Sequence, residues 1–518
     1  MIMVKRFLMT CVWACLCYAG HASDVNVVFR GEKATVKQEV KDSVSVKVEG
    51  AHVSIISTYQ AHKLTVRLSG ESNDGQVILQ TVGKAKMKLD NLNLTSQEGA
   101  PLWLKNKKKV ELVAVDGTKN TLTIAACNDT VNHKAAVIWA KDKLKFSGKG
   151  TLNVLATGDG CKGIRSKDDI TIEELTLVVK TTGNNLGEKE NPFGGGGMPP
   201  FDFNNLTEEQ KAHFEEMRKR FEEMMQNGEG FPMMGGFGGF GPPSQRGDSV
   251  GEGGGFGGFG GFGPPPMMGD GEGGGMPFGK HKYIGTAKGI KSQKKVIVNS
   301  GNVTVTTASA GAEGIEGKEG VVLNGGTVHV TAVDDAINAN ARIEFNGADV
   351  VAISTTNDAV DANLVDFFAG GFGGFFGGGG ENQNNDPAII ISGGKVYAWS
   401  QTGPPEEGLD CDFSPLEVSG GTVFSVGAGM GDMPSVPTNE TAKQATVLLV
   451  GINITKDEPI RIYDDKGKLI ETVTVPFSLQ RSSSIVTCDK FRMGGNYTVK
   501  TLNYEKSFSI NENFTVVR

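Results

Sequence analysis

Acidic and amide side chains recur around two aliphatic residues, Ile337 and Val360, in the central part of the chain. The surrounding sequences read Asp334-Asp335-Ala336-Ile337-Asn338 and Asn357-Asp358-Ala359-Val360-Asp361-Ala362-Asn363. The segment before them carries Glu313 and Glu316 at the same offsets from Ile315. Calcium takes about six to eight oxygen ligands of this kind, whereas zinc favours His or Cys, which these turns lack. These residue types therefore favour calcium chemistry.

Equivalent positions in successive repeats would stack if the repeats form parallel coils about 4.8 Å apart. Glu313, Asp335 and Asp358 would then form a column of like charges, and a hard cation would relieve their repulsion. The alternative is that Asp and Asn only make side-chain turns, but three such turns in register favour the metal. The predicted calcium ligands are Glu313, Glu316, Asp334, Asp335, Asn338, Asp358, Asp361 and Asn363.

The elements that must position these residues are indicated by a repeat. A small residue followed by an aliphatic one recurs at Ile290, Ile315, Ile337 and Val360, at intervals of 25, 22 and 23 residues. A glycine turn before a valine-rich strand repeats in phase with it, as at 325–326. A period in the low twenties with strands and no helix is typical of a parallel β-helix coil. We therefore expect an all-β solenoid.

The coil pattern extends beyond the central stretch, and a different β pattern follows it. Apolar alternation predicts a β region over residues 23–95 that leads into the coil. The coils themselves are predicted at 96–183, 283–365 and 388–440. Alternating strands with ordinary turns predict a small antiparallel β module at 441–518, which would cover the strand edges at the end of the coil.

Two low-complexity segments rich in Gly and Phe, at 184–282 and 366–387, interrupt the repeat. Their composition cannot bury a regular core, so they read as insertions. Within the first, a capping box at Thr207 and Gln210 predicts an amphipathic helix over 207–226. Both insertions leave the coil beside its acidic turns, so we expect them to flank one edge of a shared surface.

The first 22 residues have the features of an export signal. Lys5 and Arg6 precede an apolar core at 7–19 and a small-residue cleavage site. We therefore expect a periplasmic, cell-surface or extracellular protein, with lipid anchoring at Cys15 left open. No later segment is apolar enough to span a bilayer.

The rest of the composition narrows the possible partners. A net charge of −7 argues against nucleic acid, which requires a basic footprint. Four cysteines follow the predicted signal, and their spacing fits no zinc motif. The even number permits disulfides in an oxidising compartment, but the pairing of Cys127, Cys161, Cys411 and Cys488 stays open.

The coil motifs Gly163-Ile164-Arg165-Ser166-Lys167-Asp168-Asp169 and Glu313-Gly314-Ile315-Glu316-Gly317 resemble a family of secreted bacterial carbohydrate-binding domains. The resemblance covers about residues 75–435. It implies a right-handed parallel β-helix similar to pectate lyases, bound calcium, and attachment to acidic polysaccharide such as polygalacturonate, or to cellulose. This chain departs from the family in its insertions and at Thr286-Ala287-Lys288, where an acidic turn would be expected. That coil is predicted to have lost its share of a metal site.

We expect a non-catalytic calcium-dependent polysaccharide-binding protein, with two alternatives. A pectate-type lyase would need an Arg or Lys base without an acidic partner. Arg165, Lys288 and Lys291 lie in suitable turns, but Asp168 and Asp169 are expected to keep Arg165 charged. The other alternative is a surface structural or adhesive protein whose insertions contact a partner.

Several aromatic side chains could stack on sugar rings, namely Trp103, Trp139, Tyr397 and Trp399. The basic run Lys105 to Lys109 could meet an acidic polymer.

Overall fold

The computed structural model describes residues 24–40, 42–60, 62–127, 135–188, 283–364, 386–411, 414–429 and 434–518. The predicted export signal, the predicted helix at 207–226 and most of both Gly/Phe-rich insertions lie outside these ranges. No helix in the described part of the chain is long and apolar enough to cross a membrane.

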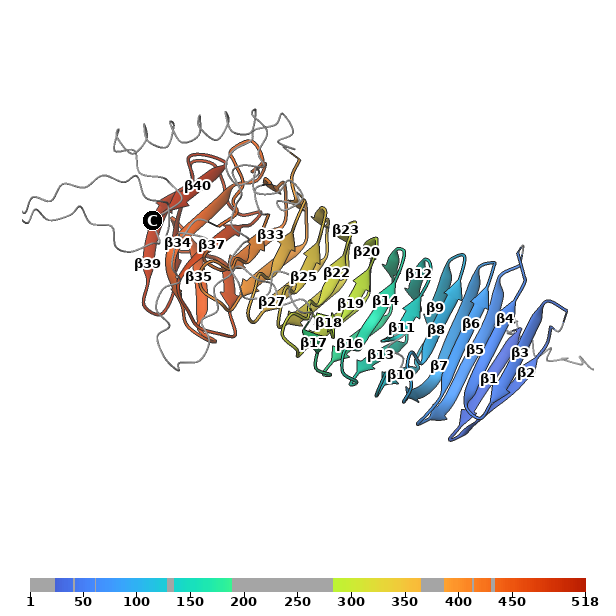
Figure 1. The fold of residues 1–518 in the computed structure, drawn as a ribbon. Coiled ribbons are helices and arrows are strands. Elements are labelled where there is room, and N and C mark those ends of the chain that lie inside the picture. The colour runs from blue at the N-terminus through green and yellow to red at the C-terminus, as the bar shows by residue number, and fades with distance from the viewer. Residues whose placement is uncertain are drawn as a thin grey trace, which may run out of the picture.

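The described chain is an elongated stack of β-strand coils that ends in a smaller β module (Figure 1). In the centre each coil has three strands, as in β22 (Ile315–Gly317), β23 (Gly320–Leu323) and β24 (Thr327–Ala332). Each of these strands pairs in parallel with its counterpart in the next coil. The predicted all-β fold with long parallel sheets of the β-helix type is confirmed, while the hand of the coil stays a prediction.

The first strand of each coil belongs to one 11-stranded sheet. Its members in order are β3 (Val44–Glu49), β4 (His52–Ser57), β6 (Gln76–Thr81), β8 (Leu102–Asn106), β11 (Ala136–Ala140), β14 (Lys162–Ser166), β19 (Ile290–Ser292), β22, β25 (Ile337–Ala339), β28 (Val360–Ala362) and β31 (Leu409–Asp410). From β4 to β31 the pairings are parallel, so every residue of one coil lies beside its counterpart in the next.

The second and third strands of the coils form the other walls. The second strands are β9 (Val110–Ala114), β12 (Leu144–Ser147), β15 (Ile170–Ile172), β20 (Lys295–Val298), β23, β26 (Ile343–Phe345), β29 (Ile389–Ile391) and β32 (Leu416–Val418). The third strands are β10 (Lys119–Ile124), β13 (Thr151–Ala156), β16 (Thr176–Thr181), β21 (Asn302–Thr307), β24, β27 (Asp349–Ser354), β30 (Lys395–Ser400) and β33 (Thr422–Val426). The longer strand β7 (Ala85–Ser96) spans both walls, because it pairs with the second strand β9 and the third strand β10. At the N-terminal end β1 (Val25–Arg30) pairs antiparallel with β2 (Lys33–Gln38) and parallel with β5 (Leu64–Ser72).

The repeated aliphatic residues fill the interior of the coil. Ile290, Ile315, Ile337 and Val360 are all fully buried. Glycine precedes Ile290 and Ile315 because a Cβ would clash there: at Gly314 it would lie 2.2 Å from Val330 Cγ1 and 2.6 Å from the Ala336 carbonyl oxygen. Alanine takes this position before Ile337 and Val360. The small-plus-aliphatic pattern thus results from the close contact between the first strand of a coil and its third strand.

Side-chain amides also join successive coils at one corner. Asn324 Nδ2 donates to Asn299 Oδ1 at 2.8 Å, and Asn346 Nδ2 donates to Asn324 Oδ1 at 2.9 Å. The Ser392 hydroxyl then donates to Asn346 Oδ1 at 2.9 Å. This ladder satisfies polar groups at a turn and adds to the backbone register.

The C-terminal module is built on the last coil. Strand β33 pairs antiparallel with β37 (Leu479–Thr487), which pairs with β34 (Thr446–Ile454), and β34 pairs with β40 (Phe514–Val517). An antiparallel four-stranded sheet follows the order β36 (Leu469–Thr474), β35 (Pro459–Asp464), β38 (Asn496–Lys500) and β39 (Glu505–Ser509). The predicted antiparallel module is therefore confirmed, and its strand β37 covers the edge of β33.

Two short paired strands bring the ends of the first insertion together. Strand β17 (Leu186–Glu188) pairs antiparallel with β18 (Tyr283–Gly285), with Leu186 opposite Gly285 and Glu188 opposite Tyr283. The chain therefore leaves the coil and returns to it at one place.

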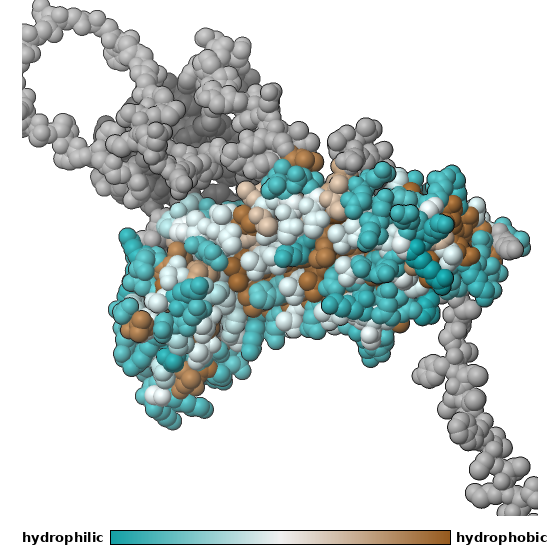
Figure 2. Space-filling model, turned by 90° about the horizontal axis from the view of Figure 1, so that it is seen from below, coloured by the Kyte–Doolittle hydropathy of each residue, from teal (hydrophilic) through white to brown (hydrophobic). Residues whose placement is uncertain are grey.

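The described surface is largely polar. On the face shown in Figure 2 residues of hydrophilic and intermediate hydropathy cover most of the body, with smaller hydrophobic areas between them. Cys127 is half-buried, Cys161, Cys411 and Cys488 are buried, and no disulfide joins these four cysteines within the described ranges.

Candidate functional site

The repeat brings six of the eight predicted ligands into two columns along the 11-stranded sheet, and Asp334 and Asn363 lie outside these columns. The first column is the position after the buried aliphatic residue of each coil. Paired in register, its members are Arg165 in β14, Lys291 in β19, Glu316 in β22, Asn338 in β25, Asp361 in β28 and Asp410 in β31. Neighbours in such a column are separated by the strand spacing of about 4.8 Å.

The second column lies two residues before the aliphatic residue. Its members are Lys162, Lys288, Glu313, Asp335, Asp358 and Glu407, in the same coil order. Backbone hydrogen bonds hold this position in register, for example from the Gly289 amide to the Glu313 carbonyl at 3.0 Å. Both columns therefore change from cations in β14 and β19 to acids and amides in the later coils.

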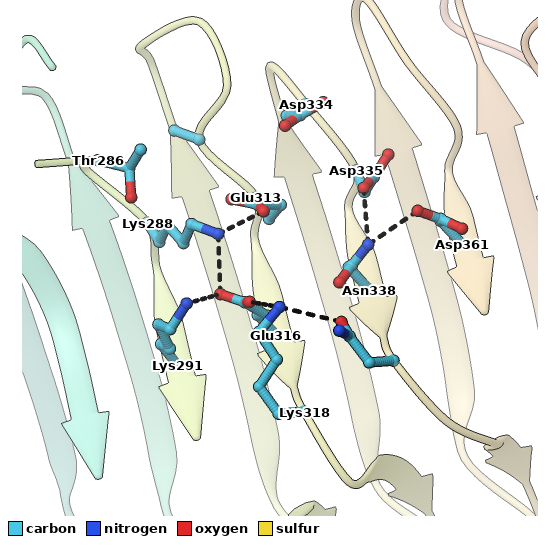
Figure 3. Close-up of polar contacts among 12 residues, drawn as sticks. Thr286, Lys288, Lys291, Glu313, Glu316, Lys318, Asp334, Asp335, Asn338 and Asp361 are labelled. Atoms are coloured by element: carbon cyan, nitrogen blue, oxygen red, sulfur yellow. Dashed lines mark hydrogen bonds and ion pairs between the residues drawn. The ribbon is translucent and has the colours of Figure 1, made fainter. Parts of the chain in front are cut away.

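Glu316 lies where the columns change from positive to negative charge, and three lysines surround it (Figure 3). Its carboxylate lies 2.9 Å from Lys288 Nζ, 2.7 Å from Lys291 Nζ and 2.6 Å from Lys318 Nζ. Lys288 also pairs with Glu313. Glu316 is fully buried and Lys288 is 9% exposed, so solvent screens these contacts little.

The pKa shifts follow from this arrangement. Burial alone would raise the pKa of Glu316, but Lys288, Lys291 and Lys318 outweigh it and hold that pKa well below its usual range. Burial opposes the charge on Lys288, yet Glu313 and Glu316 raise its pKa to about 12. Like-charge repulsion, which was the reason for predicting a metal at Glu313 and Glu316, is therefore relieved here by ammonium groups.

The next two coils hold carboxylates and amides instead. Asn338 Nδ2 donates to Asp335 Oδ2 at 2.9 Å and to Asp361 Oδ2 at 2.8 Å (Figure 3). Asn363 Nδ2 donates to both oxygens of Asp361 at 2.8 Å. Asp335 and Asp361 are 1% and 3% exposed. The amides supply donors to these buried carboxylates but bring no positive charge.

The remaining predicted ligands lie at the edges of this group. Asn357 Nδ2 donates to Asp334 Oδ1 at 2.9 Å and to Asp335 Oδ1 at 2.6 Å, so Asp334 is linked through an amide. Asp358 accepts a hydrogen bond from the Glu407 backbone amide at 2.5 Å. Burial, followed by the charges of Asp410, Asp361 and Glu406, raises the pKa of Asp358 well above its ordinary value.

Glu407 and Asp410 are site residues that the sequence prediction missed. They occupy the same offsets around Leu409 as Asp358 and Asp361 occupy around Val360. The Glu-Gly-Leu-Asp sequence carries the signal, but the second insertion lengthens this interval and hides the repeat.

The donor set of the acidic coils is made of oxygen atoms, since both columns here contain Asp, Glu and Asn and neither His nor Cys. This chemistry fits calcium rather than zinc. Within the described ranges, however, no three acidic, His or Cys side chains converge on one point that could hold an ion. An ion at these coils would therefore need further oxygens from amides, water or a ligand.

The prediction that Asp168 and Asp169 keep Arg165 charged is wrong. Asp169 pairs with Lys143 at 3.0 Å, and Asp168 Oδ1 accepts a hydrogen bond from the Asp169 amide at 2.8 Å. Burial lowers the pKa of Arg165, and the charge that opposes this shift is that of Glu316 from a later coil. The turn that follows β14 thus directs its acids away from the arginine.

The aromatic candidates divide into two groups. Tyr397 and Trp399 stack on each other with ring centroids 5.6 Å apart, and they pack against the cluster that joins β30 to the C-terminal module. Trp103 and Trp139 instead precede Arg165 in the first column, in register with it. Lys105, from the predicted basic run, lies 3.8 Å from the ring centroid of Trp103. Only Trp103 and Trp139 therefore share a column with the charged residues.

The comparisons with known proteins concern the same coils. A family model described as carbohydrate-binding domain-containing protein matches residues 31–192 and 276–362. A curated carbohydrate-binding domain-containing protein from Acetivibrio thermocellus is 31% identical over 166 residues, which cover 30% of this chain and 54% of that protein. The chain thus spans about half the length of the curated relative it matches.

One solved structure also aligns with this chain, at low similarity. The polysaccharide lyase-like protein from C. thermocellum, in a gadolinium derivative, aligns with a TM-score of 0.39 and 19% identity, over 65% of this chain and 92% of that one. The two segments that match the family model contain both columns from Lys162 to Asp361. These segments of the chain are similar to a carbohydrate-binding domain family.

Proposed function

We propose that this protein is an exported, non-catalytic protein that binds acidic polysaccharide of the polygalacturonate type through calcium. The observation that carries the proposal is the pair of in-register columns in which Asp335, Asp358 and Asp361 are buried beside one another in consecutive coils. The match of both segments to a carbohydrate-binding family supports a saccharide as the ligand.

The residues that would hold calcium are Asp335, Asp358 and Asp361, joined by Asp410 of the following coil. Asn338 and Asn363 would contribute amide oxygens if their side chains turned over, since amide orientation follows the local hydrogen-bond network. Bound calcium would supply positive charge that offsets the buried carboxylates and attracts those of a uronic acid.

An acidic polymer suits this site better than a neutral one. The protein carboxylates form an incomplete ligand set, and uronate carboxylates can supply the missing oxygens. Without a cation the same carboxylates would repel the polymer. Cellulose, which has no carboxylates, is therefore expected to bind less strongly than polygalacturonate.

The proposed location agrees with this ligand. The features of residues 1–22 support export, and large polysaccharides of this kind lie outside the cytoplasm.

The test is retention on immobilised polygalacturonate, first with calcium and then with a chelator. We expect calcium-dependent retention that Asp361→Asn and Asp358→Asn each reduce at least about tenfold, and weak retention on cellulose. Lys47→Gln, which alters an exposed side chain far from the columns, is the matched control. Equal retention of the wild type with and without calcium would contradict the calcium part of the proposal.

One observation favours a polysaccharide lyase as a second candidate. Burial, together with the charges of Arg165, Lys288 and Lys291, lowers the pKa of Lys162 to about 8. A lysine with such a pKa can act as a general base near neutral pH. The same incubation should therefore be followed by absorbance for unsaturated sugar products. Product that disappears in Lys162→Met would replace the binding proposal by this one.

A further inference from the structure

We propose that the basic coils preceding the acidic ones form a second subsite, which binds a sugar carboxylate directly through Arg165, Lys162 and Lys291 without calcium. This inference rests on the proposed function for the class of polymer, but it does not depend on the proposed metal. The subsite would use the coils of β14 and β19, where both columns carry cations instead of acids.

The charges of the basic coils are not balanced by the neighbouring acids. The columns in β14, β19 and β22 contain four cations, Lys162, Arg165, Lys288 and Lys291, and two carboxylates, Glu313 and Glu316. Lys318 adds another cation at Glu316. Buried or half-buried charges are normally paired, so this region favours an additional anion.

Both carboxylates, Glu313 and Glu316, already pair with lysines. Glu313 pairs with Lys288, and Glu316 contacts Lys288, Lys291 and Lys318. Lys162, in contrast, donates to the Thr286 carbonyl oxygen at 2.8 Å. A neutral carbonyl satisfies one of its donors but leaves its charge uncompensated, which makes Lys162 a ready partner for a carboxylate.

Arg165 provides the most suitable geometry for this ligand. Its Nε atom is buried and has no hydrogen-bond partner within the described part of the chain. A guanidinium group offers a planar fork of donors that matches a carboxylate, and such charge-assisted pairs are stronger than neutral hydrogen bonds. A carboxylate at Arg165 would satisfy a donor that would otherwise stay unpaired.

An independent observation comes from the neighbouring coil. Trp139 lies in register with Arg165 and is 9% exposed. Its Nε1 atom is buried and, among the described residues, likewise has no hydrogen-bond partner. An indole donor beside a guanidinium group suits a ligand that carries both hydroxyl and carboxylate oxygens. A uronic acid has both, whereas a simple inorganic anion or a neutral sugar does not.

The position of this subsite connects it to the acidic coils. Arg165 and Asn338 are three strands apart in the same column, which corresponds to about 14 Å along the sheet. A polymer lying across the coils would present one uronate to the basic coils and another to the acidic coils. The first would bind directly and the second through calcium.

The experiment is calorimetric titration of the full chain with trigalacturonate in the presence of a chelator. We expect binding that Arg165→Gln weakens at least about tenfold and that rising salt also weakens. Arg165→Lys, which keeps the charge but loses the fork, should be intermediate, and Trp139→Phe should weaken binding less than Arg165→Gln. The methyl-esterified trisaccharide should not bind. Lys149→Gln, a change at an exposed lysine outside the columns, is the matched control.

Retention on polygalacturonate with calcium, measured on the same variants, separates the two proposals and checks folding. Calcium-dependent retention of Arg165→Gln together with loss of binding in chelator supports the subsite. If the wild type is retained with calcium but does not bind in chelator, the subsite is overturned and the proposed function stands. Equal binding by Arg165→Gln or by the methyl ester also overturns it. Absence of binding in both conditions overturns both proposals.

Discussion

At the scale of single residues, one structural position carries three kinds of chemistry. The residue after the buried aliphatic is a cation in β14 and β19, a lysine-bound acid in β22, and an amide or acid in the coils that follow. Glu316 separates the two regions, because its carboxylate neutralises lysines on one side while Asn338 begins the acidic group on the other. The identity of this residue therefore determines the charge that each coil presents at this position.

Replacing Glu316 by glutamine should destabilise the protein. Three lysines would lose their shared buried counter-charge, and removing one partner of a buried ion pair costs about 3–5 kcal/mol. Unfolding in urea measures the change. Glu505→Gln, which alters an exposed pair with Lys500, should leave the midpoint unchanged. Equal midpoints for Glu316→Gln and the wild type would show that the lysines are solvated rather than paired.

The stability of the protein should depend on Lys162 at alkaline pH. Its pKa is about 8 in the folded state, against the ordinary lysine value of 10.5 in the unfolded chain, because burial and the cations Arg165, Lys288 and Lys291 outweigh Glu316. Between these values the unfolded chain binds more protons, so the free energy of unfolding should rise as the pH increases from about 8 to 10.5.

Lys162→Met provides the comparison. Its free energy of unfolding, measured by urea titration at several pH values, should rise less steeply than that of the wild type over the same interval. Binding of trigalacturonate in chelator should show the opposite dependence and weaken above about pH 8, because neutral Lys162 attracts a carboxylate less. Parallel stability curves for the two proteins would contradict this assignment.

At the scale of elements, the sequence repeat predicted the coils well, because their period comes from local requirements. An aliphatic side chain must fill the interior, and the residue before it must be small where strand and wall meet closely. The same offsets also predicted which site residues would be neighbours. The charge environment of Arg165 could not be predicted, because Asp169 pairs with Lys143 and the acid that acts on Arg165, Glu316, comes from a later coil.

The prediction of calcium at Glu313 and Glu316 depended on a similar assumption. The sequence indicated that acids would stack, but the structure brings Lys288, Lys291 and Lys318 to Glu316, and Lys288 also pairs with Glu313. Glu407 and Asp410 were missed because the second insertion interrupts the interval. The choice of ion-pair partner and the effect of an insertion are both set by three-dimensional neighbours rather than by local sequence.

Gly314→Ala tests the close approach inside the coil. The new Cβ would lie within 2.2 Å of Val330 Cγ1, so atoms must move, and overpacking of this kind costs about 1–3 kcal/mol. The thermal midpoint should fall. Gly403→Ala is the control, because a Cβ there meets no atom within 4 Å. A similar change in both variants would mean that the coil can shift to accept the methyl group.

At the scale of the whole molecule, the solenoid arranges two electrostatic regions along one face. Cations of β14 and β19 lie beside acids of β25, β28 and β31 in the same sheet. Polymers with regularly spaced charges can contact both regions, whereas a small anion can contact only one. If the proposed polymer binds, the long sheet would allow several weak contacts to act together.

Calcium affinity should accordingly depend on the glycan. No three acidic, His or Cys side chains in the described residues converge on one ion, so the protein alone should bind calcium weakly. Trigalacturonate should strengthen calcium binding at least about tenfold in calorimetric titration, and calcium should strengthen trigalacturonate binding by the same factor. Magnesium, which demands a stricter octahedral set of ligands, is the control ion. Calcium affinity that is unchanged by the sugar would contradict a shared site.

The pairing of β17 with β18 separates the first insertion from the stacking of the coils. It brings the two ends of the first insertion together, while β14 pairs with β19 and β16 pairs with β21 as if the chain were continuous. The stacking of the coils is thus independent of what is attached at that point. The charged face therefore keeps its spacing across a point where 94 residues, 189–282, separate β17 from β18 in the sequence.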